Sequence, residues 1–205
     1  MGKLITVVGN SGVGKTTFIK RFCEAGTFTP ILEVTHERPF LQKFRHDLKG
    51  FCLANQVDFL LYQAEMQLFI QENELVGVQD GGLGLSFHVF TKRFYQKGYL
   101  DDGEYKLCER LYSMLRRILP SPNLQIVLSA PRSVIAERMR RRGRLNDIER
   151  TKDLEALDEL FAAWLREESG IPTIELDASK DDPTYAYLIP DLLKEVRCEL
   201  KLANG

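Results

Sequence analysis

The sequence of 205 residues lacks several features that mark other classes of protein. Its four cysteines are widely separated and form no C-x-x-C pair, which argues against a disulfide framework and fits reduced thiols in a cytosol. Its three histidines do not have the spacing of zinc ligands. No apolar run approaches the roughly 20 residues of a membrane span, and the first expected strand leaves no room for a signal peptide. We therefore expect a soluble, cytoplasmic protein.

An excess of charge of either sign is also missing. The chain has 28 Lys and Arg residues against 29 Asp and Glu residues, so it has no overall signature of a protein that binds nucleic acid. Linkers, internal repeats and low-complexity tracts are absent as well. The length is most simply that of one domain, covering residues 1–205.

The most informative feature present is a match to the phosphate-binding pattern G-x-x-x-x-G-K-[ST]. It follows an apolar run, residues 4–8, and leads into an amphipathic stretch, which is the strand–loop–helix context that the pattern needs. Glycines let successive backbone N–H groups surround phosphate oxygens, and the helix N-terminus adds its dipole. Lys15 then reaches the outer phosphates. The residues that we expect to bind ATP here are Gly9, Asn10, Ser11, Gly12, Val13, Gly14, Lys15, Thr16 and Thr17.

Short apolar runs alternate with longer amphipathic stretches along the chain, which is typical of a parallel sheet covered by helices. The expected strands are Lys3–Gly9, Thr29–Val34, Leu75–Gln79, Leu124–Ser129 and Thr173–Leu176. The expected helices are Lys15–Glu24, Phe51–Gln71, Ser86–Gln96, Asp101–Leu119, Pro131–Arg142, Lys152–Glu168 and Asp182–Leu202. The pattern predicts an α/β protein, a three-layer P-loop NTPase fold with a five-stranded parallel sheet flanked by helices.

Acidic residues follow two of the expected strands, at the edge where open α/β sheets bind ligands. Asp80 comes directly after an apolar strand, where a carboxylate can orient Mg²⁺ together with the Thr16 hydroxyl. A helix-capping role is the alternative for Asp80. Glu33 could accept a proton from a substrate hydroxyl, but Glu37 lies only four residues further on, and residue type alone does not choose between them.

Arginines cluster between residues 138 and 144. Arg138 and Arg142 are four residues apart on one helix face, and Gly143 lets the chain turn so that Arg144 can approach them. Arginines on a closing lid, about residues 138–150, would neutralise charge on a phosphoryl group in transfer. A solvated basic helix face and a nucleic-acid contact are the alternatives.

These motifs, in this order and at this spacing, resemble the deoxynucleoside kinase family over nearly the whole chain, from Lys3 to Asp182. The segment Glu33-Val34-Thr35-His36-Glu37-Arg38-Pro39-Phe40-Leu41 resembles the family's Glu-Pro-Val segment and the Asn-Pro-Phe-Leu that follows it in bacterial members. That register favours Glu33 over Glu37 as the base for the substrate 5′-hydroxyl. Arg138, Arg142 and Arg144 reproduce the family's lid pattern R-x-x-x-R-x-R.

The resemblance also implies roles for residues elsewhere in the chain. Gln56 matches the glutamine that reads the nucleobase edge, and Phe90 matches the aromatic residue that stacks on the base, although a core role is an alternative for Phe90. Asp147 corresponds to a lid acid that touches the sugar 3′-hydroxyl. The loop beside the ATP adenine would contain Asp177, Ser179 and Lys180.

The substrate half departs from the family pattern. The family follows its acidic residue with Arg-Ser, whereas Asp80 is followed by Gly81-Gly82. Arg45 occupies the position of a sugar-contacting tyrosine, and Gln63 and Ser86 stand where many members have an Arg–Asp pair that discriminates among bases. Two glycines and Arg45 would suit a substrate anion, so a phosphorylated substrate is an alternative.

The resemblance therefore implies an ATP-dependent kinase that phosphorylates the 5′-hydroxyl of a deoxynucleoside, with ATP and Mg²⁺. The alternatives are a kinase for nucleoside monophosphates or another small molecule, and an ATP-binding regulator or slow NTPase without kinase activity. The partner is a small molecule, with no nucleic acid and no membrane. The long helices Phe51–Gln71 and Asp101–Leu119 could pack two subunits together as a homodimer, as in the family, or simply form core.

Overall fold

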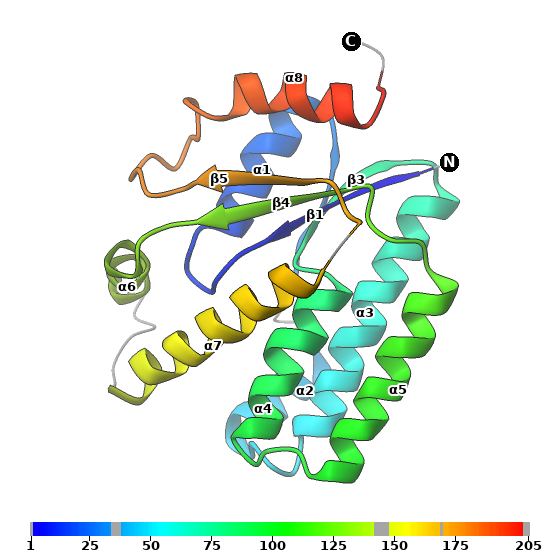
Figure 1. Cartoon of the computed structure of the whole chain (residues 1–205), viewed down its shortest axis with the longest axis vertical. Coiled ribbons are helices and arrows are strands. Elements are labelled where there is room, and N and C mark those ends of the chain that lie inside the picture. The colour runs from blue at the N-terminus through cyan, green and yellow to red at the C-terminus, as the bar shows by residue number, and fades with distance from the viewer. Residues whose placement is uncertain (1, 34–37, 142–147, 169, 203–205) are drawn as a thin grey trace.

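Parallel pairing joins all five strands into one sheet of order β2-β3-β1-β4-β5 in a computed structural model, which describes residues 2–33, 38–141, 148–168 and 170–202 (Figure 1). The predicted five-stranded parallel sheet flanked by helices is thus confirmed. The strands are β1 (Lys3–Val8), β2 (Thr29–Ile31), β3 (Val76–Asp80), β4 (Leu124–Ser129) and β5 (Thr173–Asp177). Central strand β1 pairs with β3 on one side and β4 on the other, with Val7 opposite both Asp80 and Ile126.

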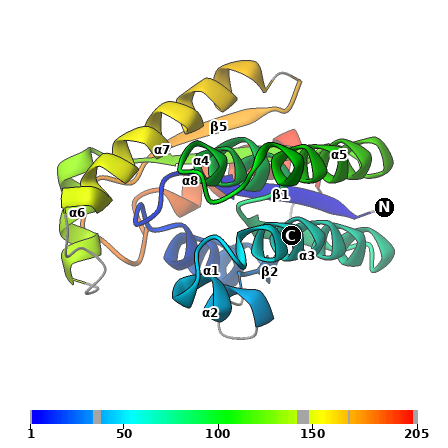
Figure 2. The ribbon, with the colours of Figure 1, turned by 90° about the horizontal axis from the view of Figure 1, so that it is seen from below.

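The helices cover both faces of the sheet, which explains why the central strands are apolar on both sides. Helices α1 and α8 pack on one face, and α3, α5, α7 and the π-helix η1 on the other (Figures 1 and 2). Helix α2 lies beside α3, and α6 lies at the carboxyl ends of the strands (Figures 1 and 2). The helices are α1 (Lys15–Gly26), α2 (Pro39–His46), α3 (Cys52–Glu72), η1 (Leu85–Thr91), α4 (Lys92–Gln96), α5 (Asp102–Ile118), α6 (Arg132–Arg141), α7 (Ile148–Glu167) and α8 (Ile189–Glu199).

Three elements differ from those predicted. Helix α2 was not expected, although Pro39 at its first position is a common helix start. The expected helix Ser86–Gln96 divides into η1 and α4, and the last helix begins at Ile189 rather than Asp182. In the latter case the Asp182 carboxylate accepts hydrogen bonds from Thr184, at 2.9 Å from the backbone N–H, so a turn replaces the first helical turns.

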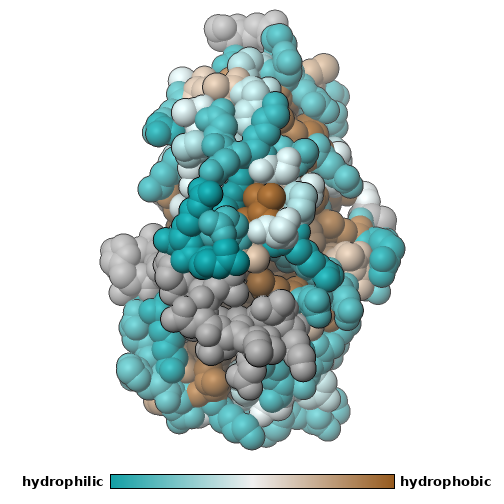
Figure 3. Space-filling view, turned by 90° about the vertical axis from the view of Figure 1, so that its left-hand side faces the viewer, coloured by the Kyte–Doolittle hydropathy of each residue, from teal (hydrophilic) through white to brown (hydrophobic). Residues whose placement is uncertain are grey.

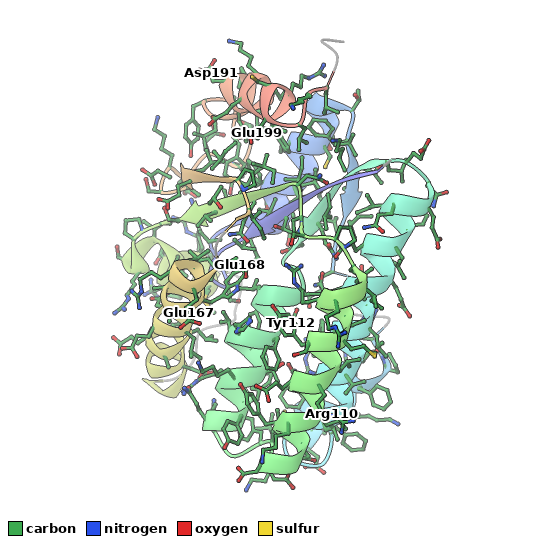
Figure 4. The ribbon with its side chains drawn as sticks, turned by 45° about the vertical axis from the view of Figure 1, so that its right-hand side comes forward. Arg110, Tyr112, Glu167, Glu168, Asp191 and Glu199 are labelled. Atoms are coloured by element: carbon green, nitrogen blue, oxygen red, sulfur yellow. The ribbon has the colours of Figure 1, made fainter. Side chains whose placement is uncertain are left out.

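Aromatic rings hold η1 against α5. The ring of Phe87 stacks on Tyr112 with centroids 4.6 Å apart, and the Tyr112 hydroxyl lies 3.1 Å from His88 Nε2 (Figure 4). Within η1, Thr91 Oγ1 lies 3.0 Å from the carbonyl oxygen of Ser86, five residues earlier. Ser86 and Phe90 of this segment both line one cavity, described below, and π-turns frequently accompany functional sites.

None of the helices in the described ranges is both long and apolar enough to cross a membrane.

Candidate nucleotide and acceptor site

The phosphate loop joins β1 to α1 in the conformation that the glycine pattern predicts. Gly12 and Gly14 have φ values of 89° and 116°, a region that other residues rarely adopt. A Cβ at Gly14 would also collide with the Tyr185 hydroxyl. The Lys15 ammonium folds back over the loop and donates to the carbonyl oxygens of Gly9 (2.9 Å) and Asn10 (3.3 Å). These carbonyl contacts hold the charge at the place where the loop would receive phosphate.

Two oxygen donors meet at the start of α1. The Thr16 hydroxyl donates to Asp80 Oδ2 at 2.8 Å, which links the first turn of the helix to the end of β3. A hydroxyl and a carboxylate are hard oxygen ligands of the kind that Mg²⁺ takes alongside water and substrate phosphates. The donor set therefore fits the predicted metal site, with Asp80 placed by the alternation of β3 on the α1 side of the sheet.

Beside this loop is a cavity of about 260 Å³, which we call the acceptor cavity. Its volume is a little below the range of about 300–1,000 Å³ typical of small-molecule sites. Segments from both faces of the sheet and from its carboxyl edge meet around it. The lining residues are Ser11, Lys15, Glu33, Leu41, Phe44, Asn55, Gln56, Phe59, Gln63, Asp80, Gly81, Leu85, Ser86, Phe90 and Phe94.

Glu33 and Lys15 bring opposite charges to one end of the acceptor cavity. Partial loss of hydration beside the cavity raises the pKa of Glu33 above its ordinary value, and the neighbouring Asp80 carboxylate raises it further, while Lys15 and Arg38 oppose both effects. Burial lowers the pKa of Lys15, and the carboxylates of Asp80 and Glu33 act against that shift. A carboxylate of raised basicity beside a phosphate-binding lysine suits proton removal from a hydroxyl.

The other end of the acceptor cavity is neutral. The amide oxygen of Gln56 lies 2.9 Å from Thr91 Oγ1, which ties α3 to η1. Phe90 lines the cavity and also packs against the cluster of Val8, Val127 and neighbouring residues, so it contributes to the core, and its role in stacking on a base stays a prediction. Apolar rings with a few amides are the usual composition of a site for a flat, polar-edged ligand.

Sequence reasoning missed several lining residues, of which Asn55 is the most informative. Its side chain lines the cavity, the residue is only 2% exposed, and its amide oxygen has no hydrogen-bond partner among the described residues. Asn55, Phe59 and Gln63 follow one another at intervals of four on α3, so they share a helix face. That spacing was the available signal.

The structure places Arg45 away from the acceptor cavity. Helix α2 turns Leu41 and Phe44 toward the cavity, and Arg45, one residue further on, is exposed and donates to Gln42 at 3.3 Å. Consecutive side chains on a helix point about 100° apart, so Arg45 points away from the cavity when Phe44 points into it. Among the described lining residues Lys15 is then the one cation, which gives little support to an anion site for a phosphorylated acceptor.

A second cavity, of about 180 Å³, lies on the other side of the phosphate loop. It is lined by Gly14, Thr17, Arg138, Arg141, Asp181, Asp182, Pro183 and Tyr185. Asp181, at the end of the loop predicted to lie beside the ATP adenine, lines this cavity, and the contact of that loop with adenine stays a prediction. Earlier in the loop, the Asp177 carboxylate accepts a hydrogen bond from the Ser179 N–H at 2.8 Å, and the Lys180 ammonium lies over the Tyr187 ring.

Arg138 joins three segments around this second cavity. From α6 its guanidinium donates to the carbonyl oxygen of Val13 in the phosphate loop (2.8 Å) and to that of Lys180 (2.7 Å). Hydrophilic residues cover much of this face of the molecule (Figure 3). The remaining predicted lid residues Arg142, Arg144 and Asp147, and the rival base Glu37, lie outside the described residues.

Comparison with known proteins identifies the family of this chain. The family model described as deoxynucleoside kinase matches residues 5–196. The chain belongs to the deoxynucleoside kinase family. Membership makes it an ATP-dependent phosphotransferase that acts on nucleosides.

Individual members of the deoxynucleoside kinase family are similar over most of their length. A deoxyadenosine/deoxycytidine kinase of Bacillus subtilis is 27% identical over 176 residues, covering 84% of this chain and 81% of the relative. A deoxyadenosine kinase of Dictyostelium discoideum is 29% identical, covering 80% of this chain and 65% of the relative. The structure of a deoxyadenosine kinase from M. mycoides with bound dCTP superposes with a TM-score of 0.74 at 21% identity, covering 94% of this chain and 99% of that one. The last comparison shows the shared fold.

Proposed function

We propose that this deoxynucleoside kinase transfers the γ-phosphoryl group of ATP to the 5′-hydroxyl of a deoxynucleoside bound in the acceptor cavity. The observation that carries the proposal is that Glu33, Lys15 and Asp80 line the same cavity as Gln56 and Phe90. Charged groups for phosphoryl transfer and neutral groups for a base thereby face one space. We treat residues 1–205 as one kinase domain, with a lid at about 138–150.

In the proposed mechanism, Glu33 removes the proton from the 5′-hydroxyl while the oxygen of that hydroxyl bonds to the γ-phosphorus. The bond between that phosphorus and the oxygen of the β-phosphate breaks, and ADP leaves. Lys15 and the backbone N–H groups of the loop hold the phosphate oxygens. Thr16 and Asp80 would hold Mg²⁺, which when bound neutralises charge on the phosphates. Arg138, Arg142 and Arg144 would close over the nucleotide, and Asp147 would meet the sugar.

Gln56 and Phe90 hold the base in this proposal, with Phe44 and Phe59 adding apolar walls. The cavity supports a nucleoside better than a monophosphate, because Lys15 is its one cation among the described lining residues and the phosphate loop already engages it. A location in the cytoplasm is consistent with the four free cysteines.

We also propose that the protein forms a homodimer through α3 and α5. Both helices expose large apolar side chains, each between 42% and 66% exposed, although the two helices already pack on each other. These residues are Leu61, Leu68 and Phe69 on α3, and Leu107, Met114 and Ile118 on α5. Exposed apolar groups gathered on neighbouring helices are typical of an interface.

The test is ADP release from Mg-ATP with each of the four deoxynucleosides, with their monophosphates, and without an acceptor. We expect release that depends on a deoxynucleoside. Glu33→Gln should lower that rate by at least about a hundredfold, as expected when a general base is lost, and leave ATP binding within about twofold. Turnover with monophosphates alone, or ADP release at the same rate with and without an acceptor, would contradict the proposal.

A further inference from the structure

Two buried glutamines connect β3 to the acceptor cavity. Side chains alternate along a strand, so Asp80 faces α1 while Gln79, one residue earlier, faces α3. There it meets Gln63, which lines the acceptor cavity. Gln79 is 2% exposed and Gln63 is 4% exposed, so neither amide can turn freely toward water.

The orientation of the Gln79 amide follows from its partners. Its Nε2 lies 3.1 Å from the backbone carbonyl oxygen of Gln63 and close to the Gln63 side-chain oxygen. A backbone carbonyl can only accept a hydrogen bond, so Gln79 must present its NH₂ group there. The second proton of that NH₂ group is then directed at Gln63 Oε1.

The orientation of the Gln63 amide follows in turn. Its oxygen is occupied by Gln79, and its Nε2 lies 3.4 Å from the backbone carbonyl oxygen of Asp80, which also can only accept. Both ends of the amide therefore agree on one arrangement. Reversing it would bring two donors together at Gln79 and two acceptors together at Asp80, each left unpaired inside the protein.

Gly81 leaves this NH₂ group open toward the acceptor cavity. A Cβ at Gly81 would lie 3.6 Å from Gln63 Nε2, and the φ of 81° favours glycine at this position. Of the two protons on Gln63 Nε2, one is directed at Asp80 and the other has no partner among the described residues. Gln63 thus offers the cavity a fixed hydrogen-bond donor and no acceptor.

We propose that Gln63, held by Gln79, determines which base is phosphorylated, by donating to a carbonyl oxygen of the base. The inference rests on the proposed function and deepens it. A base with a carbonyl group at that place pairs with the donor, whereas an amino group there would put two buried donors face to face. The site therefore favours 6-oxopurine and 4-oxopyrimidine deoxynucleosides over their amino counterparts. Gln79 is a positioning residue, because it acts through Gln63.

The test uses two substrate pairs that differ in this group, deoxyinosine with deoxyadenosine and deoxyuridine with deoxycytidine. For at least one pair, we expect kcat/KM to favour the carbonyl member by about tenfold or more, as expected for a buried hydrogen bond against an unpaired one. Gln63→Met should reduce that ratio to within about threefold. Gln79→Met should reduce it as well with kcat little changed, since only the 3.4 Å contact with the Asp80 carbonyl oxygen then holds the Gln63 amide in its orientation.

Gln67→Met is the matched control. Gln67 is also a buried glutamine of α3, its amide donates to the carbonyl oxygen of Pro120, and it does not line the acceptor cavity. The Gln67→Met variant should be less stable than the wild type, without any change in the ratio of kcat/KM between the carbonyl and amino substrates. A wild-type preference for the amino members, or a ratio that survives both Gln63→Met and Gln79→Met, would overturn the inference.

Calorimetric binding of the same four nucleosides separates this inference from the proposed function. Binding that favours carbonyl members without ADP release would contradict the kinase mechanism and leave the role of Gln63 supported. Binding of none of them would overturn the role of Gln63.

Discussion

The carboxyl group of Glu33, beside Lys15, sets the expected pH dependence of the reaction at acidic pH. Phosphoryl transfer needs Glu33 as a carboxylate, and its pKa is raised above the ordinary value of 4.5 by desolvation and by Asp80. The residue remains exposed, so water limits the shift. We expect kcat/KM for the nucleoside, measured at saturating ATP, to rise with pH through a midpoint above 4.5 and to reach its plateau once Glu33 is ionised.

The control for this prediction is Glu33→Gln. Its residual rate should no longer depend on pH over the acidic range in which the wild-type rate climbs. An acidic midpoint that persists in Glu33→Gln would assign the titration to another group and contradict the role of Glu33.

At the scale of single residues, the sequence was most informative for residues that belong to a short local motif. Lys15 and Thr16 lie on the phosphate loop and the first turn of α1, because a glycine-rich loop fixes its own geometry, and Asp80, at the end of β3, meets Thr16 there; their roles stay predictions. The orientation of the Gln63 amide could not be predicted, because it depends on Gln79 and on the carbonyl group of Asp80, both on another element. The unpartnered oxygen of Asn55 likewise becomes visible only once the packing is known.

Among the elements, α6 is linked to the phosphate loop by a charged side chain, so we expect its position to affect ATP binding. Its Arg138 bridges the phosphate loop and the 177–185 segment, whereas Arg132 at its start forms exposed ion pairs with Asp158 (2.8 Å) and Glu155 (3.4 Å). We expect Arg138→Ala to raise the KM for ATP by about tenfold or more, since hydrogen bonds from a charged group are worth about 1.5–3 kcal/mol. The KM for the nucleoside should change less than about twofold.

Arg132→Ala is the matched control on the same helix. Its ion pairs are exposed, and such pairs contribute about 0–1 kcal/mol to stability, so both KM values should stay near those of the wild type. Steady-state kinetics with each substrate varied in turn provide the measurement. Equal effects of the two substitutions on the KM for ATP would show that α6 is not coupled to the nucleotide through Arg138.

The elements themselves were largely predictable, and the exceptions have physical causes. All five strands were found to within a few residues, and the central strands β1, β3 and β4 gave the clearest signal because each is buried along most of its length. Helix α2 has only eight residues, about two turns, which is too short a stretch for a helical period to stand out in the sequence. The π-helix η1 has no sequence signature of its own, since its wide turn is stabilised by packing against α5 and α7.

For the whole molecule, the order of the strands explains why chemistry from distant parts of the sequence meets at one edge. All five strands are parallel, so their carboxyl ends and the segments that follow them lie at the same edge of the sheet. Glu33 follows β2, Asp80 ends β3 and Arg138 lies on the helix after β4, so residues far apart in sequence reach this edge together. The fold therefore follows from the pattern of apolar residues along the chain, while the choice of substrate depends on the particular side chains that lie at this edge.

Most of the exposed large apolar side chains among the described residues lie on α3 and α5, and this gathering predicts self-association. The double variant Leu68→Glu with Met114→Glu places charges on both helices, at residues that are 42% and 53% exposed, so each monomer should still fold. In sedimentation at micromolar concentration we expect a two-chain mass for the wild type and a one-chain mass for this variant, because burying unpaired charge in an interface is costly.

Leu48→Glu is the control for that experiment, since Leu48 is 40% exposed and lies outside both helices. It should keep the mass of the wild type. If charge alone separated the chains, Leu48→Glu would do so too; if the wild type is a single chain at every concentration, the apolar faces of α3 and α5 do not pair two copies. A stable interface needs about 800 Å² on each partner, which two neighbouring helices of 21 and 17 residues are long enough to supply.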